Sequence, residues 1–328
     1  MTFDTARVNV PKYIRELPEY NGGVAIQYLT DDKENIIRQD GYVARRWDSK
    51  VAERFHLLIS ELGKHFDGKI EGVNFPETAV GFGDSGKLYP EGFTPEGYRN
   101  AILKQMKAGK KAFQNSVVLQ YANFMPGEWL PWEDKGYLES LYQFAKEHNI
   151  AMGGPDIKIY KKAQINHSYK FLKTFSDDIT TGVAVQWGNY EEINPKTARQ
   201  VSIEEIHTFG KEEVGLDYIF WCTQEPFYSE HLHPYLEKQY VAYPVQGVSE
   251  LYKTLYTKDS LLFNVGFNQC DITVFERLVS ENFEFYHDQS GVTSSKATFI
   301  DGTRNGLCKL DYQPLRALVK GSLEAFPL

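Results

Sequence analysis

Short apolar runs alternate with longer segments of helical periodicity over about the first 230 residues. The apolar runs begin near positions 70, 117, 150, 182 and 217. Between them, apolar residues recur every three or four positions, as on the buried side of a helix. The last four starts are 33, 32 and 35 residues apart by subtraction, which is about the length of one strand plus one helix. This alternation predicts a parallel α/β sheet.

Capping residues mark the beginnings and ends of the predicted helices. Thr94 and Pro95 are typical of a helix start, and Ser202 with Glu205 three positions later has the spacing of a capping box. Gly68 is typical of a helix stop. Further helices are expected over residues 48–66, 135–148 and 168–175.

The segment before position 48 predicts a different arrangement. Two β-prone runs, over 24–29 and 42–46, flank the polar tract 31–35, which is the pattern of a hairpin. Val8 and Val10 are expected to form the tail of a strand.

Polar side chains follow the carboxyl ends of the predicted strands, the edge at which parallel α/β sheets carry their functional groups. Pro76 ends the strand over 70–75 because it has no N–H for the ladder, so Glu77 is left at that edge. A carboxylate there acts as a catalytic acid or only caps the next loop. The other polar residues near strand ends are Gln120, Asn123, Asp156, Gln186, Asn189, Gln224 and Glu225.

All five tryptophans also lie in or just after such ends. They are Trp47, Trp129, Trp132, Trp187 and Trp221. Indole rings stack on the C–H faces of sugars, while amides and carboxylates bind the hydroxyl groups. The set therefore indicates a carbohydrate site; the alternative is that the tryptophans only close the fold. No strand is followed by a glycine-rich phosphate-binding motif.

The composition of the chain argues against nucleic acid and membranes as binding partners. The 328 residues are 42% hydrophobic, enough for a sizeable core, and a net charge of −8 with scattered basic residues gives no footprint for nucleic acid. No signal peptide and no apolar run of membrane-spanning length occurs, so we expect a cytoplasmic protein without a membrane partner.

The cysteines and the paired histidines predict no metal or other cofactor. Cys222, Cys270 and Cys308 lack the spacing of a zinc site or a disulfide framework, so we expect reduced thiols. His231 and His233 share one side of a predicted extended segment, but no third ligand follows at suitable spacing. We interpret both as solvated loop residues.

Through its succession of strands and helices, with Glu77 and Trp221 at strand ends, the stretch from about 8 to 235 resembles the later part of a clan A glycoside hydrolase (β/α)8 barrel. The resemblance implies that Glu77, at the end of strand four, is the acid/base and that Trp221 is the strand-eight tryptophan. Two residues depart from the family pattern. Pro76 stands where the family has Asn, and Gln186, an amide, occupies the place of the nucleophilic Glu.

The expected catalytic pair is Glu77 with Glu225, and Asp156 and Glu191 are the alternatives for the second carboxylate. The predicted substrate-binding residues are Asn123, Trp129, Asp156, Gln186, Trp187, Asn189 and Trp221.

After a linker over 239–247, the composition changes to long amphipathic segments. A helix from 248, a second from 270, a strand over 283–288 and a helix over 295–307 are expected. The Phe-Asn-Gln-Cys-Asp turn at 267–271 and the Phe-Tyr-His-Asp run at 285–288 resemble the opening half of the nuclear transport factor 2-like (SnoaL-like or ketosteroid-isomerase-like) superfamily. That resemblance implies a ligand pocket faced by His287 and Asp288.

The sequence thus predicts an α/β protein with a partial (β/α)8 TIM-type barrel over 1–238, followed by a partial α+β cone domain over 248–328. The leading function is hydrolysis of a glycosidic bond in an oligosaccharide or glycoside. The alternatives are a non-catalytic sugar-binding barrel, and a small-ligand or dimerisation protein acting through the C-terminal domain. Because each part lacks strands of its family's fold, we expect a homo-oligomer that covers the exposed sheet edges.

Overall fold

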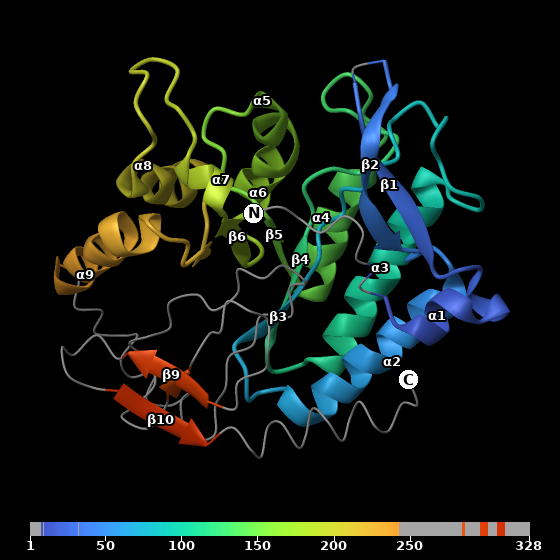
Figure 1. Cartoon of the computed structure of the whole chain (residues 1–328), viewed down its shortest axis with the longest axis horizontal. Coiled ribbons are helices and arrows are strands. Elements are labelled where there is room, and N and C mark those ends of the chain that lie inside the picture. Colours follow the sequence, from blue (N-terminus) through green and yellow to red (C-terminus); the bar gives the residue numbers. More distant parts are fainter. Residues whose placement is uncertain are drawn as a thin grey trace. The chain divides into compact units, whose positions relative to one another are not determined.

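The computed structural model describes residues 8, 10–31 and 33–242, together with three short strands nearer the C-terminus. The protein is of the mixed α/β class (Figure 1). Its chain divides into two compact units, the first extending to Leu236 and the second containing the three C-terminal strands. Each unit is described separately below.

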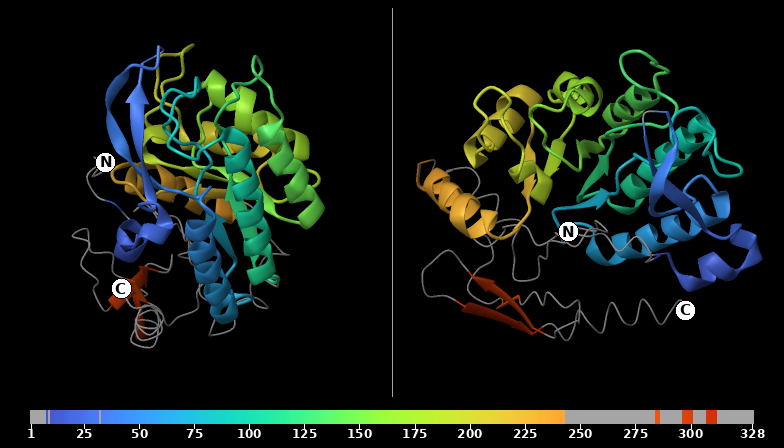
Figure 2. Two further views of the ribbon diagram at one scale, coloured as in Figure 1. Left: turned by 90° about the vertical axis from the view of Figure 1, so that its right-hand side faces the viewer. Right: turned by 45° about the horizontal axis from the view of Figure 1, so that its top comes forward.

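A five-stranded parallel sheet forms the centre of the first unit. Its strands follow one another in chain order, each hydrogen-bonded to the next. The sheet is curled, and helices lie along its outer side (Figure 2). All five strands predicted from the apolar runs are confirmed: β3 (Gly72–Phe75), β4 (Val117–Tyr121), β5 (Ala151–Gly154), β6 (Thr181–Val185) and β7 (Tyr218–Trp221).

Helical segments precede, connect and follow the strands of the parallel sheet. The long ones are α2 (Ser49–Phe66), α3 (Pro95–Ala112) and α4 (Tyr137–His148), followed by α6 (Lys170–Phe175), α8 (Ile203–Thr208) and α9 (His233–Ala242). The short ones are α5 (Lys162–Gln164) and α7 (Trp187–Tyr190), with three π-helical turns, η2 (Ile165–Tyr169), η3 (Phe209–Val214) and η4 (Tyr228–Leu232).

The predicted helix starts are confirmed by their caps. The Asp48 carboxylate accepts hydrogen bonds from the first-turn amides of α2, and Thr94 Oγ1 accepts one from the Gly97 amide of α3. Ser202 and Glu205 form the reciprocal bonds of a capping box at α8. Gly68 has a φ of +73°, the left-handed conformation expected just after a helix.

The two faces of the sheet have different roles. Val73 and Phe75 of β3 face the helices and belong to the main core. Leu119 and Tyr121 of β4 belong to a smaller cluster on the other, concave face. There, Gly153 of β5 lies so close to β6 that an added Cβ would be 1.7 Å from the Gly182 carbonyl oxygen, so only glycine fits.

The segment before α2 contains the predicted hairpin, β1 (Val24–Thr30) paired antiparallel with β2 (Ile36–Ala44). The expected strand tail at Val8 and Val10 is wrong. Neither residue is in a strand, and the chain instead enters α1 (Lys12–Glu16), because Pro11 is well suited to precede a first helical turn. A 3₁₀ turn, η1 (Pro18–Tyr20), links α1 to the hairpin.

In the second unit, the described backbone is an antiparallel sheet with the order β10-β9-β8. Strand β8 (Glu284–Phe285) lies within the strand expected over 283–288. The helix expected over 295–307 is wrong, because β9 (Lys296–Ile300) and the start of β10 (Leu307–Asp311) occupy it. The helices expected from 248 and 270 lie outside the described residues.

Among the described helices, none combines the length and apolar character that crossing a membrane requires.

Candidate functional site

The candidate site lies at the carboxyl edge of the parallel sheet, beginning with Glu77. Strand β3 ends at Phe75, as Pro76 predicts. The Gln120 side-chain amide of β4 donates a 2.8 Å hydrogen bond to the Pro76 carbonyl oxygen, while Gln105 of α3 donates a 2.9 Å bond to Gln120 Oε1. The backbone that enters Glu77 is therefore held by neighbouring elements.

The Glu77 carboxyl group is mostly buried and, among the residues that the structure describes, has one side-chain hydrogen-bond partner. Asn123, which follows β4 and is 3% exposed, donates a 2.6 Å hydrogen bond from Nδ2 to Glu77 Oε2. Burial raises the pKa of Glu77, and the negative charge of Asp156 raises it further. The bond from Asn123 and the positive charges of Arg46 and Lys161 lower this pKa, but burial dominates and the net shift is upward.

Asp156, after β5, forms the second part of the site. Asn189 of α7 donates a 3.2 Å hydrogen bond from Nδ2 to Asp156 Oδ1, and its own Oδ1 accepts one of 2.6 Å from the Gln186 amide. The Gln186 side chain donates to the Pro155 carbonyl oxygen at 2.8 Å. Each of the two carboxylates is thus held by an asparagine from the next strand end, Glu77 by Asn123 and Asp156 by Asn189.

The loop between β4 and α4 starts at this site and carries an aromatic surface. Phe124 follows Asn123, and its ring stacks on Trp129 with a centroid separation of 5.7 Å and an interplanar angle of 8°. Trp129 is 40% exposed, whereas Trp132, further along the loop, is 73% exposed. Trp129 is therefore partly exposed to solvent, with Phe124 stacked on one face of its indole.

His167 of η2 holds that loop through a hydrogen bond to its main chain. Its Nε2 accepts a 2.9 Å hydrogen bond from the Leu130 amide, and its Nδ1 is 2.8 Å from the Ala163 carbonyl oxygen. A backbone N–H can only donate, so Nε2 is unprotonated and Nδ1 carries the hydrogen. His167 is fully buried and its ring contacts both Phe124 and Trp129. Burial lowers the pKa of His167.

The structure does not bring the other predicted indoles to this surface in the same way. Trp221 is buried, on the helix-facing side of β7, with His207 beside it. Trp187, which begins α7, is half-buried and donates a hydrogen bond from Nε1 to Glu191. Trp47 belongs to the core, in edge contact with Phe82 and Phe93. Trp221 thus packs rather than lines the strand-end edge.

Glu225 has a structural partner. Its exposed carboxylate accepts a 2.6 Å hydrogen bond from the Ser229 hydroxyl and a 3.3 Å bond from the Ser229 amide, so it caps the turn of η4.

The extended segment expected for His231 and His233 is wrong, because His231 lies in η4 and His233 begins α9. Within the described ranges, no three His, Cys, Asp or Glu side chains gather in a way that would hold a metal ion.

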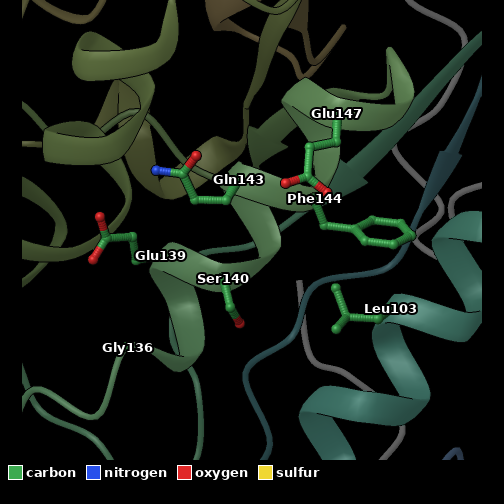
Figure 3. A pocket seen from close by; sticks show the side chains of 7 residues that line it. All are labelled: Leu103, Gly136, Glu139, Ser140, Gln143, Phe144 and Glu147. Carbon is green, nitrogen blue, oxygen red and sulfur yellow. The ribbon is translucent and has the colours of Figure 1, made fainter.

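A separate open pocket of about 370 Å³ lies between α3 and α4, away from the strand ends (Figure 3). It is lined by Leu103, Gly136, Glu139, Ser140, Gln143, Phe144 and Glu147, none of which the sequence singled out. The predicted pocket residues of the C-terminal domain, His287 and Asp288, lie outside the described residues.

Sequence reasoning missed three residues that shape the site. Arg46 lowers the pKa of Glu77, the Tyr98 hydroxyl donates a 3.0 Å hydrogen bond to the carbonyl oxygen of Thr78 beside Glu77, and His167 holds the Trp129 loop. Each acts on the site from an element far away in the chain, and none carries a local motif. For Arg46 the only signal was its position at the end of the predicted hairpin.

Comparison with known protein families finds no family model that matches the chain, and comparison with curated proteins finds no match either.

Proposed function

We propose that this protein hydrolyses a glycosidic bond, with Glu77 as the general acid. The observation that carries the proposal is the setting of Glu77: a carboxyl group at the carboxyl edge of a parallel sheet, mostly buried and with a raised pKa. A general acid must hold its proton near neutral pH, and burial is a common means of achieving this in carboxylic acids.

Asp156 is the better candidate for the second carboxylate. Its charge acts on Glu77, whereas Glu225 is exposed and bonded to Ser229. Glycoside hydrolysis uses two carboxyl groups on either side of the bond that breaks. In this role Glu77 protonates the leaving oxygen. On the opposite face of the sugar, Asp156, which Asn189 holds in orientation, either attacks the anomeric carbon itself and is later released by water, or takes the proton of the water that attacks this carbon.

Trp129 supplies a surface for a neighbouring sugar ring. Its indole is partly exposed and is backed by Phe124, which adjoins the Asn123 that contacts Glu77. Stacking of a sugar on this indole would hold the glycosidic oxygen near Glu77.

The curled five-stranded sheet supports the reading of its strands as the later part of a (β/α)8 barrel. On that reading β3 is strand four and β7 is strand eight. The proposal rests on the chemistry of the site and does not depend on this count.

The test is the activity of Glu77→Gln on a panel of chromogenic glycosides and polysaccharides. On the best substrate, we expect turnover to fall by roughly 10²- to 10⁴-fold, the usual contribution of general acid catalysis. Substrates with an activated leaving group need less protonation, so the loss should be smaller for them. This dependence on the leaving group separates loss of an acid from general damage.

The matched control is Glu71→Gln. Glu71 directly precedes β3, at the opposite end of the strand, and accepts a hydrogen bond from Tyr218 instead of a site residue. It should keep near wild-type turnover. A wild-type protein that hydrolyses no member of the panel, or a Glu77→Gln variant with unchanged turnover, would refute the proposal.

A non-catalytic sugar-binding protein is the second candidate, favoured by Gln186. An amide stands where the resembled family has its nucleophile, and its Nε2 is engaged with Pro155. Calorimetry with oligosaccharides would distinguish the two functions. Binding that is equal in wild type and Glu77→Gln, without turnover in either, would favour this candidate. A role for the C-terminal domain in ligand binding or dimerisation stays a prediction.

A further inference from the structure

Arg46 connects the hairpin to the main chain of Glu77. It lies two residues beyond the end of β2, and its Nη1 donates a 3.0 Å hydrogen bond to the Glu77 carbonyl oxygen. The same guanidinium lies over the ring of Tyr98, 5.3 Å from the ring centroid. A side chain outside the parallel sheet therefore fixes the residue to which we assign the acid.

Tyr98 of α3 extends this contact to the next residue. Its ring is fully buried, and its hydroxyl donates a 3.0 Å hydrogen bond to the Thr78 carbonyl oxygen. The Thr78 hydroxyl in turn donates a 2.7 Å bond to the carbonyl oxygen of Phe124. Glu77 and Thr78 are thus held from the hairpin, from α3 and from the loop after β4.

The contacts of the Arg46 guanidinium are with the Glu77 carbonyl oxygen and the Tyr98 ring. Arg46 forms no ion pair with any residue that the structure describes, and its Nε is buried without a hydrogen-bond partner there. The charged groups that act on the Glu77 carboxyl are Asp156 from the loop after β5, Lys161 before α5, and Arg46. Arg46 is the one among them that also bonds to the Glu77 backbone.

We propose that Arg46 is a positioning residue, which holds the main chain of Glu77 and keeps a positive charge beside its carboxyl group. This inference rests on the proposed function, since it assigns Arg46 a role through the acid. The positive charge favours the ionised form of Glu77. A general acid must give up its proton in one step and regain it afterwards, so its ionised form must not be too unfavourable. The positive charge offsets the rise in pKa that burial causes.

The experiment is an NMR titration of Glu77 in protein labelled with ¹³C at the glutamate carboxyl carbons, with the Glu77 signal assigned by its loss in Glu77→Gln. It needs no substrate. Arg46→Met removes the charge and keeps an apolar stem, so the midpoint of Glu77 should move to higher pH. Arg46→Lys keeps the charge, so its midpoint should stay nearer to the wild-type value than that of Arg46→Met.

Arg45→Met is the matched control. Arg45 is the preceding residue and has a similar environment: it bonds to the carbonyl oxygens of Asn21 and Glu91, and lies over Trp47. It should leave the Glu77 midpoint unchanged. If Arg46→Met does not fold, Arg46→Gln, which removes the charge but keeps a side-chain N–H donor, replaces it in the same titration and should also move the Glu77 midpoint to higher pH.

On an active wild type, the alkaline limb of the pH–rate profile should move upward in Arg46→Met and not in Arg45→Met, and kcat should fall more than KM rises. Equal titration shifts in Arg46→Met and Arg45→Met, or none in Arg46→Met, would overturn the role of Arg46. An inactive wild type would instead refute the proposed function and leave the titration result intact.

Discussion

Tyr218 Oη donates a 2.7 Å hydrogen bond to Glu71 Oε1, joining the first residue of β7 to the residue just before β3. These strands are the two edges of the sheet, four strand spacings apart. In a flat sheet, strands so far apart would be separated by roughly 19 Å, which these two side chains could not span. The bond therefore requires the curl of the sheet, and it closes the concave face at the amino edge, opposite Glu77.

Removing this bond should weaken the curled sheet. Tyr218→Phe keeps the ring, which stacks on Phe220, and deletes only the hydroxyl. We expect the free energy of unfolding to fall by about 1 kcal/mol, a typical value for one hydrogen bond. Urea denaturation of Tyr218→Phe, Glu71→Ala and the double variant measures the coupling between the two residues. Fully additive effects would show that the bond contributes nothing to stability.

Gly109 should not tolerate alanine, although it lies inside a helix. Alanine normally stabilises a helix interior by roughly 0.5–1 kcal/mol relative to glycine. Here, however, an added Cβ would be 2.5 Å from Cε2 of Phe75, because α3 packs directly on β3. Gly109→Ala should therefore lower the free energy of unfolding, by about 1–3 kcal/mol.

Lys107→Ala, an exposed change in the same helix, is the control for propensity and should be nearly neutral. Thermal unfolding of both variants gives the answer. A gain in stability from Gly109→Ala would mean that α3 can move away from the sheet without loss.

Local patterns were sufficient to predict most elements of the first unit. Pro76, Thr94 and Ser202 act on their own neighbours in the chain, and so the end of β3 and the starts of α3 and α8 follow from sequence alone. The segments at 8–10 and 295–307 were assigned wrongly from short runs with little periodicity. At 295–307 strand pairing depends on partners elsewhere in the chain, whereas at 8–10 the adjacent Pro11 is a local signal for the start of α1.

The candidate site was predictable only in part. Glu77, Asn123, Asp156 and Asn189 follow strand ends, and the parallel arrangement brings them to one edge. The roles of Arg46 and His167 depend on side chains that meet across segments remote in sequence, and no local pattern encodes such a meeting. Trp221 ends a strand but faces away from the site, because the period of two along β7 places it on the helix-facing side of the sheet with Val183 and Val185.

Acid should weaken the attachment of the Trp129 loop through His167. Burial lowers the pKa of His167 in the folded protein, so the unfolded chain, with an ordinary histidine pKa of about 6.5, takes up its proton first as the pH falls. The contribution of neutral His167 to the free energy of unfolding is therefore fully present above about pH 6.5. It decreases as the pH falls from there to the folded-state pKa.

The measurement is hydrogen exchange of the Leu130 amide, followed by NMR across that range. Its N–H bonds to His167 Nε2, so protonation of the ring should speed its exchange relative to other amides of the loop. His167→Gln should remove this pH dependence. Exchange at Leu130 that follows the general pH trend of its neighbours would contradict the assignment.

The two asparagines of the site should have separable effects on the carboxyl groups they contact. The 2.6 Å hydrogen bond from Asn123 lowers the pKa of the Glu77 carboxyl group. Asn123→Ala removes this bond and leaves the carboxyl group mostly buried. The pKa of Glu77 should therefore rise further, and activity at alkaline pH should extend upward. Asn189→Ala instead releases Asp156 and should change the Glu77 titration less. Carboxyl NMR on both variants measures this difference, and a larger shift of Glu77 in Asn189→Ala would reverse the assignment of the two amides.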